Sequence, residues 1–479
     1  MMKAFFAIIT LTFRNALRSH IFQMLAVLLL LCVTVIPISI SVGKAEEFIR
    51  VSLLYSLWSV SIVLALSSLW LGCFVMSQDI DSYQIHMVVA KPVSRITVWL
   101  GKWVGINLIN ISLLLASGAA VYAVVMTRYH AAGSEMSLSE RQSERTKAES
   151  EKERIKTKIL AGRRSYFPSR PEPEKIAEAA VKNYADNAAK EGKKVSSKEL
   201  EKLYNDLIAK YTNAPDEVLV GQNPLQTWVF TNVPQKLNQH EIFLRYRPYL
   251  GKVSSEDQRQ TYLWWEVLFP LINKETQNYQ LYPRGLTQGP EQIFSGAFIE
   301  TALPPGSVTP DGEVIVRVAN YDRYGAKHYY QQSDGPKLLV PVCSFEENYL
   351  RAMLVMSIQL LLLSGLSCAF GGFLTMPTAV FMVASYLLFG SFSMILTDSE
   401  FFVSSTMDKF SQILANILLT VVIPLQRFDI TDLLSGGDLI EFSLIGKLFF
   451  EYFLLRGLPL FLFGIWMYRK RELGLVVRK

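Results

Sequence analysis

The stretch SQDIDSYQIHMVVAKPVSRITVWLGKWVG, residues 77–105, is charged and contains a proline, yet it lies between two strongly apolar runs. Its first half has apolar residues at helical spacing, which predicts an amphipathic helix that Pro92 ends. Ser77 is placed to cap this helix, and Asp79 and Asp81 fall where a helix N-terminus favours negative charge. The pattern indicates a cytoplasmic connection between two membrane helices.

Beyond Pro92 the helical period restarts, and Lys91, Arg95 and Lys102 supply cations of the kind that keep a short loop in the cytoplasm. Residues 77–102, called the elbow below, have two interpretations. Bent and charged, the elbow suits docking to a cytoplasmic partner. Alternatively, its cations only fix the topology of the chain, as in many short loops.

The apolar runs around the elbow are long enough to cross a membrane, since a helix needs about 20 apolar residues to span a core of roughly 30 Å. Six segments qualify: 22–42, 51–76, 103–126, 350–374, 377–397 and 446–468. A run at 413–424 is too short to cross, and we expect a re-entrant segment over 402–424 on the outer side. Gly101 and Gly105 have the GxxxG spacing that permits close helix contact.

Positive charge predicts the side of the membrane on which each end of the chain lies. Lys3, Arg14 and Arg18 precede the first crossing, and a cluster of Arg and Lys follows the last. Since cytoplasmic segments are enriched in Lys and Arg, we expect a multi-pass protein of the inner (cytoplasmic) membrane with both termini in the cytoplasm. The N-terminal apolar residues could be mistaken for a signal peptide, but no small-residue cleavage site follows them. Because they precede Arg14 and Arg18, they instead predict an amphipathic helix at the cytoplasmic interface.

Residues 127–349 form a large insert between the third and fourth crossings, on the outer side by this topology. Its first part, 134–213, is dense in Glu, Lys, Arg and Ala, which predicts charged helical arms. The clearest arm is 197–212, with an apolar stripe behind Ser196. We favour a helical hairpin. The alternative is a partly disordered charged linker, because the segment has little apolar content from which to build a core.

The second part of the insert, 214–345, has aromatic residues set among Pro, Gly and Asn, which favours short strands. EVIVRVANY at 313–321 alternates apolar and polar residues, and KLLVPVCSF at 337–345 closes the segment. Together they predict a small β-sandwich. The aromatic side chains of such a sandwich usually form its core; if exposed, they would instead suit an envelope glycan.

The sequence carries no signature of an enzyme. It has no G-x-x-x-x-G-K-[ST] phosphate loop, no H-E-x-x-H and no G-x-S-x-G motif. The stretch 434–437, LSGG, copies much of the signature loop of ABC ATPases, but without a phosphate loop it predicts only a Gly-Gly turn. The four Cys and five His have no metal-ligand spacing. The net charge of +6 is modest, and the basic residues lie where membrane topology places them and do not form a nucleic-acid patch. We therefore expect no metal, no cofactor and no nucleic-acid partner.

Polar residues inside the predicted crossings are costly and therefore informative. Asn107 and Asn110 lie one turn apart in the third crossing, and Glu451 and Arg456 lie in the last. All four are candidates for lining a translocation path. Interhelical hydrogen bonding is the favoured alternative for the asparagines, whereas Arg456 needs Glu451, a partner subunit or a cavity to face.

Stretches in both halves of the chain resemble the permeases of type-2 ABC transporters. KPVSR at 91–95, followed by LGKWVG at 100–105, resembles the loop between the second and third helices of that family. Three stretches resemble its C-terminal half: FGGFLTMPTAVFMVASYLLFGS at 370–391, VVIPLQRFDITDLL at 421–434 and FGIWMYRKRELGL at 463–475. The insert and Arg456 depart from the family pattern, which leaves the substrate open.

The predicted fold is a polytopic α-helical membrane protein with six transmembrane helices and an α+β extracytoplasmic domain between helices 3 and 4. The predicted domains are 1–126, which includes the elbow, then 127–349 and 350–479.

The resemblance implies the permease subunit of an ABC exporter, paired with a second permease protomer in the lipid bilayer. ATP is then bound by a separate cytoplasmic ATPase subunit, which contacts Asp79, Asp81, Lys91, Pro92, Arg95 and Lys102. The alternative function is a non-transporting membrane scaffold whose outer domain binds envelope glycan or protein.

Overall fold

The computed structural model describes residues 2–18, 20–39, 45–81, 93–137, 152–170, 172–190, 196–212, 214–221, 224–236, 241–251, 260–272, 279–332, 334–398, 413–414, 416–420 and 422–470. The chain forms two compact units. The helical unit comprises Met1–Gly162 and Cys343–Lys479, and the sheet unit comprises Arg163–Val342.

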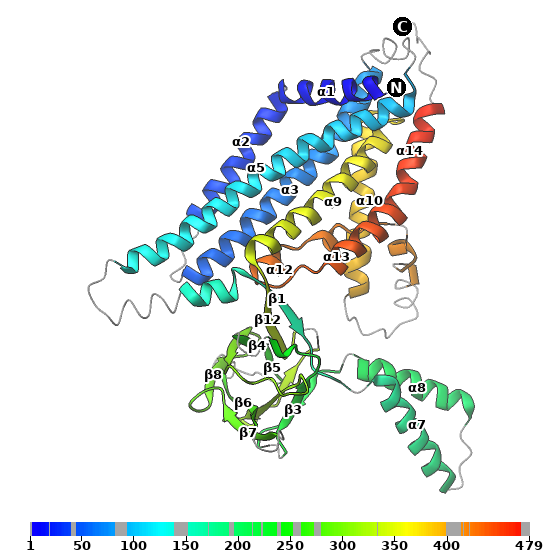
Figure 1. The fold of residues 1–479 in the computed structure, drawn as a ribbon. Coiled ribbons are helices and arrows are strands. Elements are labelled where there is room, and N and C mark those ends of the chain that lie inside the picture. The colour runs from blue at the N-terminus through cyan, green and yellow to red at the C-terminus, as the bar shows by residue number, and fades with distance from the viewer. Residues whose placement is uncertain are drawn as a thin grey trace. The chain divides into compact units, whose positions relative to one another are not determined.

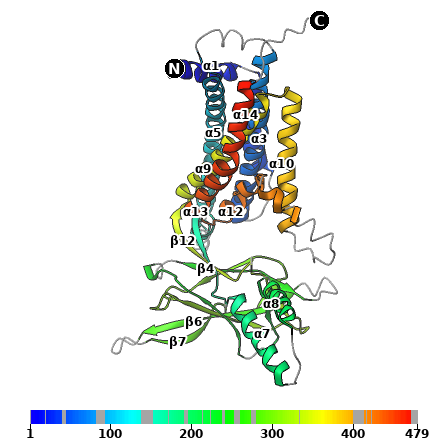
Figure 2. The ribbon, with the colours of Figure 1, turned by 90° about the vertical axis from the view of Figure 1, so that its right-hand side faces the viewer.

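The helical unit consists mainly of long helices that run side by side (Figures 1 and 2). Its named elements are α1 (Met2–Arg18), α2 (His20–Ser39), α3 (Ala45–Asp81), α5 (Arg95–Ser137), α9 (Phe345–Gly371), α10 (Met376–Asp398), η3 (Leu425–Phe428), α12 (Thr431–Ser435), α13 (Phe442–Lys447), η4 (Leu448–Gly457) and α14 (Leu458–Lys470).

Five described helices are long and apolar enough to cross a membrane, and they are Ala45–Gln78, Arg95–Ala131, Phe345–Gly371, Met376–Met394 and Phe442–Lys470. The count becomes six if Met2–Arg18 and Gln23–Pro37, which meet at a bend of 66°, are taken together as one span. The molecule is thus mostly helical, and it has the apolar helices of a membrane protein.

Helix α9 is the central helix of this unit. In an apolar stretch of 18 residues within α9, 78% is buried inside the chain, compared with 28% in the corresponding stretches of Met376–Met394 and Phe442–Lys470. Small residues bring α9 close to α3: a Cβ atom added to Gly72 would lie only 2.5 Å from the Cβ of Ser367. Close approach of this kind is how membrane helices gain packing contacts.

Two tryptophans join α5 to α9. The indole Nε1 of Trp99 donates to the carbonyl of Cys368 at 3.2 Å, and that of Trp103 donates to the carbonyl of Leu361 at 3.3 Å. The two indole rings stack on each other with centroids 6.2 Å apart. We call α3, α5 and α9 the three-helix block.

The N-terminal helix α1 packs on the start of α5 through two glycines. A Cβ on Gly101 would lie 2.9 Å from the side chain of Ile8, and one on Gly105 would lie 2.8 Å from that of Thr12. Gly101 and Gly105 are four residues apart on α5, and Ile8 and Thr12 are four residues apart on α1. One face of α1 therefore packs along one face of α5. The close helix contact predicted from the GxxxG spacing is confirmed.

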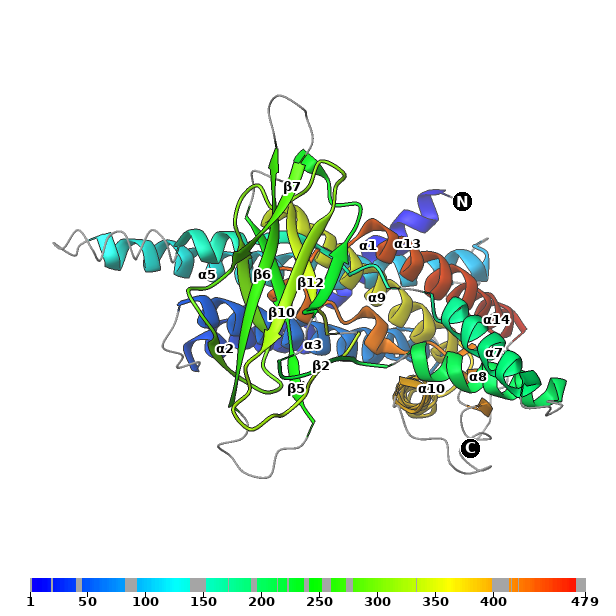
Figure 3. The same ribbon diagram turned by 90° about the horizontal axis from the view of Figure 1, so that it is seen from below.

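The sheet unit contains three sheets (Figure 3). Their strand orders are β1-β12-β4-β9, β3-β10-β6-β7 with β8 also paired to β6, and β2-β11-β5. The strands are β1 (Ala161–Tyr166), β2 (Asp216–Val218), β3 (Gln226–Phe230), β4 (Ile242–Tyr246), β5 (Pro248–Leu250), β6 (Gln260–Ile272), β7 (Tyr279–Gly285), β8 (Glu291–Phe294), β9 (Ile299–Leu303), β10 (Val314–Asn320), β11 (His328–Tyr330) and β12 (Lys337–Ser344).

The strands predicted at 313–321 and 337–345 are confirmed as β10 and β12, and β10 pairs antiparallel with β3 and β6. A sandwich has two layers, whereas the sheet unit contains three sheets, the smallest of them β2-β11-β5. The chain passes from β4 into this sheet at Arg247, whose guanidinium lies 5.1 Å from the ring centroid of Tyr249 and 4.8 Å from that of Phe298. A strand that changes sheets at a corner is a common way to turn a β-layer.

Aromatic side chains form the core of the sheet unit. Trp228, Trp265, Tyr246 and Tyr330 are all buried, and neighbouring ring centroids lie 4.7 to 6.0 Å apart. Tyr246 and Tyr330 come from two different sheets, and the two tryptophans come from the remaining one, so the cluster joins all three sheets. These aromatics are therefore core residues, and the glycan alternative does not apply to them.

Strand β1 lies within the segment that was predicted to form charged helical arms, and it was not anticipated. Arg163 on this strand is only 1% exposed, and its guanidinium donates to both carboxylate oxygens of Glu300, at 2.9 and 3.3 Å. Arg245 donates to the same carboxylate at 2.6 Å. Burial opposes ionisation of Glu300, but the two guanidinium groups outweigh it and lower its pKa to about 2. Paired in this way, a charged sequence can enter a core.

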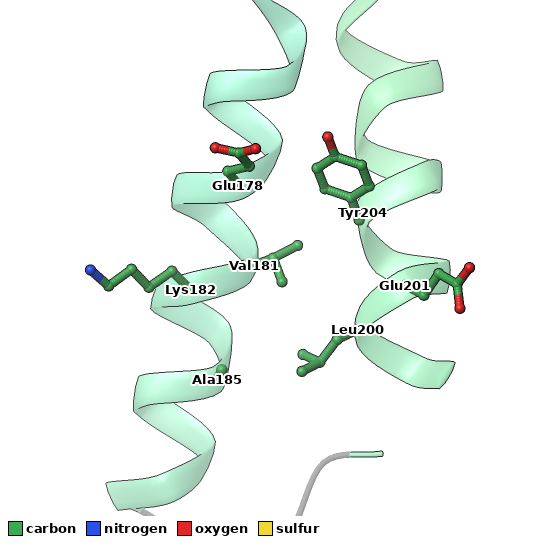
Figure 4. Close-up of a pocket in the computed structure, with 7 residues that line it drawn as sticks. All are labelled: Glu178, Val181, Lys182, Ala185, Leu200, Glu201 and Tyr204. Carbon is green, nitrogen blue, oxygen red and sulfur yellow. The ribbon is translucent and has the colours of Figure 1, made fainter. Parts of the chain in front are cut away.

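Two helices within residues 173–212 of the charged segment form a helical hairpin, as favoured from the sequence. Helices α7 (Pro173–Lys190) and α8 (Ser197–Thr212) lie against each other, and Val181 and Ala185 of α7 face Leu200 and Tyr204 of α8 (Figure 4). The backbone carbonyl of Ser196 accepts the first hydrogen bonds of α8. Much of the sequence between α5 and α7, namely 138–151, lies outside the described residues.

Candidate coupling and pathway residues

The structure changes the interpretation of the first half of the elbow. Helix α3 continues through Ser77 to Asp81, so the predicted helix start at Ser77 is wrong. Ser77 is buried, and its hydroxyl donates to the carbonyl of Gly371 on α9 at 3.3 Å. Asp79 and Asp81 therefore lie in the last turn of a helix and not in its first. A serine hydroxyl can bond to a carbonyl as well as cap a helix, and the sequence alone does not decide between them.

The middle of the elbow, residues 82–92, lies outside the described residues, and it includes Lys91 and Pro92. Beyond it, α5 begins at Arg95, close to the point where the helical period was predicted to restart. Ser94 caps this helix, because its hydroxyl accepts from the backbone N–H of Thr97 at 3.2 Å. The sequence Ser94-Arg95-Ile96-Thr97 carried this signal, and it was missed.

Lys102 does not present its charge to a partner, so its predicted docking role is corrected. The residue is only 6% exposed, and its Nζ donates to the carbonyl of Val75 on α3 at 2.8 Å. Its aliphatic stem lies along the apolar interface between α3 and α5, as long cationic side chains often do.

Arg95 ties the start of α5 to the end of α14. One of its guanidinium nitrogens donates to the carbonyl of Arg469 at 2.7 Å, and α14 ends one residue later, at Lys470. A cation at a helix C-terminus satisfies a carbonyl that has no partner within the helix. The start of α5 and the end of α14 are therefore adjacent.

Asn107 and Asn110 are buried between helices. Asn107 donates to the carbonyl of Trp103 at 2.8 Å and accepts from the hydroxyl of Ser364 on α9 at 2.7 Å. Asn110 donates to the hydroxyl of Ser68 on α3 at 2.8 Å, while its Oδ1 has no partner among the described residues. The structure has the interhelical hydrogen bonds of the favoured alternative. A role for these side chains in a translocation path stays a prediction.

Glu451 and Arg456 form an ion pair, one of the three arrangements expected for Arg456, with Nη2 and Oε1 at 2.8 Å. The two residues are five apart on η4, which is a π-helix. At 3.6 residues per turn, residues five apart in an α-helix would point about 140° away from each other. The i→i+5 bonds of a π-helix place them one turn apart on the same face, and π-helical turns are frequent at functional sites.

The guanidinium of Arg456 also contacts the segment predicted to be re-entrant. It donates to the carbonyls of Leu419 and Val422, the latter at 3.1 Å, and lies 4.8 Å from the ring centroid of Tyr452. Residues 416–420 are helical, so the carbonyl of Leu419 that Arg456 meets lies at the C-terminal end of that short helix. The part of the segment at 402–412 lies outside the described residues.

A second polar contact in this region was not predicted. The amide of Asn348, at the start of α9, donates to the carbonyl of Asp438 and accepts from the N–H of Ile440, each at 2.9 Å. Arg351 donates to the carbonyl of Ile440 at 3.1 Å and lies 4.1 Å from the ring centroid of Phe442. The sequence could have indicated this contact, because Asn348 and Arg351 are polar residues in the first turns of the fourth crossing.

The two glycines of the LSGG stretch form a turn, as predicted, and Leu434 and Ser435 end the preceding helix. Gly436 caps α12 and Gly437 has a φ of +71°, a conformation that favours glycine. Leu434 and Ser435 are buried. Across the described residues no group of three or more His, Cys, Asp or Glu could hold a metal ion.

Comparison of the chain with protein-family models, with curated proteins and with solved structures finds no match. The case for a function therefore comes from the residues and contacts described above.

Proposed function

We propose that this chain is the membrane subunit of an ABC transporter of the type-2 permease class, driven by a separate cytoplasmic ATPase and working as an exporter. In this proposal the chain crosses the inner membrane six times, with α2 as the first crossing and the paired η4 and α14 as the last. Both termini lie in the cytoplasm, and the sheet unit with its hairpin lies outside.

The observation that carries the proposal is the set of contacts around the start of α5. Helix α1 packs on α5 at Gly101 and Gly105, Arg95 binds the end of α14, and Lys102 binds α3. Four elements thus meet at the edge of the elbow. A partner that pushed on this region would move several membrane helices at once.

The three-helix block supplies a rigid path for such a push. The indole bonds of Trp99 and Trp103 fix α5 to α9, and the bonds of Asn107 and Asn110 fix α5 to α9 and α3. Helix α10 and the last crossing are far less buried within the chain. In the proposed mechanism the block moves as one body, and a path opens at the less buried helices, where a second protomer contributes the other wall.

ATP binding belongs to the partner in this proposal, because the sequence has no phosphate loop. Asp79, Asp81, Lys91 and Arg95 are the charged docking residues, and Lys102 acts inside the chain. The Glu451–Arg456 pair would hold the re-entrant segment at the outer end of the path. Breaking and reforming one ion pair is a simple way to gate such a segment.

Purification of the full chain from its own membranes tests the proposal. We expect an ATPase subunit with a phosphate loop to co-purify, and Arg95→Glu to lower its recovery at least about tenfold, because like charges placed together at an interface cost several kcal/mol. Arg128→Glu, near the opposite end of α5, is the matched control and should leave recovery unchanged. Recovery of wall polysaccharide alone, with no ATPase, would favour the scaffold instead.

A further inference from the structure

A large apolar groove lies on the helical unit between α2, α3 and α10. Its volume is about 1060 Å³, slightly above the range of about 300–1,000 Å³ for ligand pockets. Leu28 and Leu31 of α2 face Leu66 and Trp70 of α3 across it. All four side chains are between 46% and 63% exposed, so the groove is open along its side.

The two ends of the groove differ in polarity along α2. Its wall on α2 runs from His20 and Gln23 to Leu31, and the polar side chains on that helix lie at the His20 end. At 1.5 Å per residue these positions span about 16 Å, which matches one leaflet of a hydrocarbon core of roughly 30 Å. A groove of that length with one polar end has the dimensions of a lipid acyl chain that hangs from its headgroup.

The polar end of the groove lies beside a basic helix. Arg18 is exposed in the last turn of α1, two residues before His20. Helix α1 also carries Lys3 and Arg14, and neither α1 nor α2 contains an Asp or Glu. An anionic headgroup at this position would meet positive charge and no opposing carboxylate from these two helices.

We infer that this groove binds an anionic phospholipid of the cytoplasmic leaflet, with one acyl chain along α2 and α3 and its phosphate at Arg18 and His20. The inference rests on the membrane orientation in the proposed function. It does not depend on the ATPase, so the two proposals can fail separately.

Fluorescence quenching by brominated lipids tests the site in the full chain, because Trp70 lines the groove. The protein is reconstituted into phosphatidylcholine vesicles that contain either tail-brominated phosphatidylglycerol or tail-brominated phosphatidylcholine at equal mole fraction. The Trp70 signal is the difference between the wild type and Trp70→Phe. We expect about a fivefold preference for the anionic lipid at Trp70, the effect of one basic residue near a headgroup.

The chain offers a matched control on the same helix. Trp58 is as exposed as Trp70, at 49% against 46%, but it does not line the groove. Its signal, obtained from Trp58→Phe, should show no preference between the two lipids. Arg18→Gln should abolish the preference at Trp70 and leave ATPase recovery unchanged.

Equal quenching of wild-type Trp70 by the two lipids would overturn the inference. So would a dimeric protein in which Trp70 is quenched by neither lipid, because a second copy would then cover the groove. If the preference is found but no ATPase is recovered, the lipid site stands and the proposed function fails.

Discussion

The three-helix block and the sheet unit hold their buried polar groups in opposite ways. In the block the polar contacts are mostly small and neutral, such as Asn110 to Ser68 and Ser77 to the carbonyl of Gly371. In the sheet unit several of the buried polar groups are full charges, with Glu300 held between Arg163 and Arg245. The difference follows from the solvent, because a charge is far more costly to place in lipid than in a water-exposed domain.

This comparison shows where charge is informative. In the sheet unit it is part of the core and serves stability. In the helical unit Arg95 and Arg456 bind the ends of other helical segments, and Lys102 binds a neighbouring helix. In the proposed function Arg95 is a docking residue and Arg456 holds the re-entrant segment, whereas Lys102 joins two helices of the block that moves as one body.

The largest effect is expected from Glu300→Gln. The substitution leaves two buried guanidinium groups without a counter-charge, which costs about 3–5 kcal/mol. Hydrogen exchange of the full chain should accelerate in β1, β4 and β9, while α3 and α9 stay protected. Glu291→Gln, an exposed residue on β8, is the control. Equal protection in the two variants would show that the triad does not stabilise the sheet unit.

A pH effect of intermediate size should also separate the two units. Burial lowers the pKa of His328 from its ordinary value of 6.5 to about 4, and its Nε2 lies 2.7 Å from the hydroxyl of Thr261. The folded state keeps His328 neutral while the unfolded state takes up a proton, so stability is lost as the pH falls from 6.5 towards 4. The loss is about 2 kcal/mol at about pH 5.

Hydrogen exchange of β11, corrected for intrinsic rates, measures this loss, and His328→Gln should make the profile flat over the same interval. The contribution of Glu300 disappears at lower pH, between its ordinary value of 4.5 and about 2. A wild-type profile that is already flat between pH 6.5 and 4 would contradict the assignment to His328.

The contact of α1 with α5 should respond to Gly101→Leu. Even a Cβ would lie 2.9 Å from Ile8, so a leucine overpacks the contact at a cost of about 1–3 kcal/mol. Exchange should accelerate along α1 and remain slow in α9. Gly446→Leu is the matched control, because a Cβ at that position meets nothing within 4 Å. An undisturbed α1 in the Gly101 variant would remove the structural basis for coupling through this helix.

The smallest effect is expected inside the three-helix block. Ser68→Ala removes the acceptor for Asn110, and hydrogen bonds between membrane helices average about 0.6 kcal/mol. A double-mutant cycle with Asn110→Leu, measured by unfolding in detergent micelles, isolates the coupling free energy between Asn110 and Ser68. Ser59→Ala, whose hydroxyl bonds within its own helix, should have no coupling to Asn110. A coupling energy of several kcal/mol would mean that the asparagine does more than join helices.

Features that depend on local pattern could be predicted from the sequence. The apolar helices follow from run length, and the strand β10 follows from the alternation around Val316. The spacing of Gly101 and Gly105 predicted a close helix contact, although not that α1 is the helix in contact. The ion pair of Arg456 with Glu451 was one of three expected arrangements, because an arginine in an apolar helix needs a partner.

Features that depend on a distant partner could not be predicted in the same way. Strand β1 enters the core only because Arg163 meets Glu300, which is 137 residues away. Ser77 and Lys102 were assigned to an exposed elbow, but each bonds to a carbonyl of a neighbouring helix. Local patterns do not tell whether a polar side chain faces water or a backbone acceptor on another helix.

The central claim is that the elbow lies in the cytoplasm and receives the push of an ATPase. Ile96→Cys tests it directly, because Ile96 lies in the first turn of α5 and is 36% exposed. The background variant is Cys343→Ser, which removes a half-buried native thiol. A membrane-impermeant maleimide should label Ile96→Cys in inside-out vesicles and not in intact cells, and added ATPase subunit should slow the labelling. Labelling in intact cells would contradict the account.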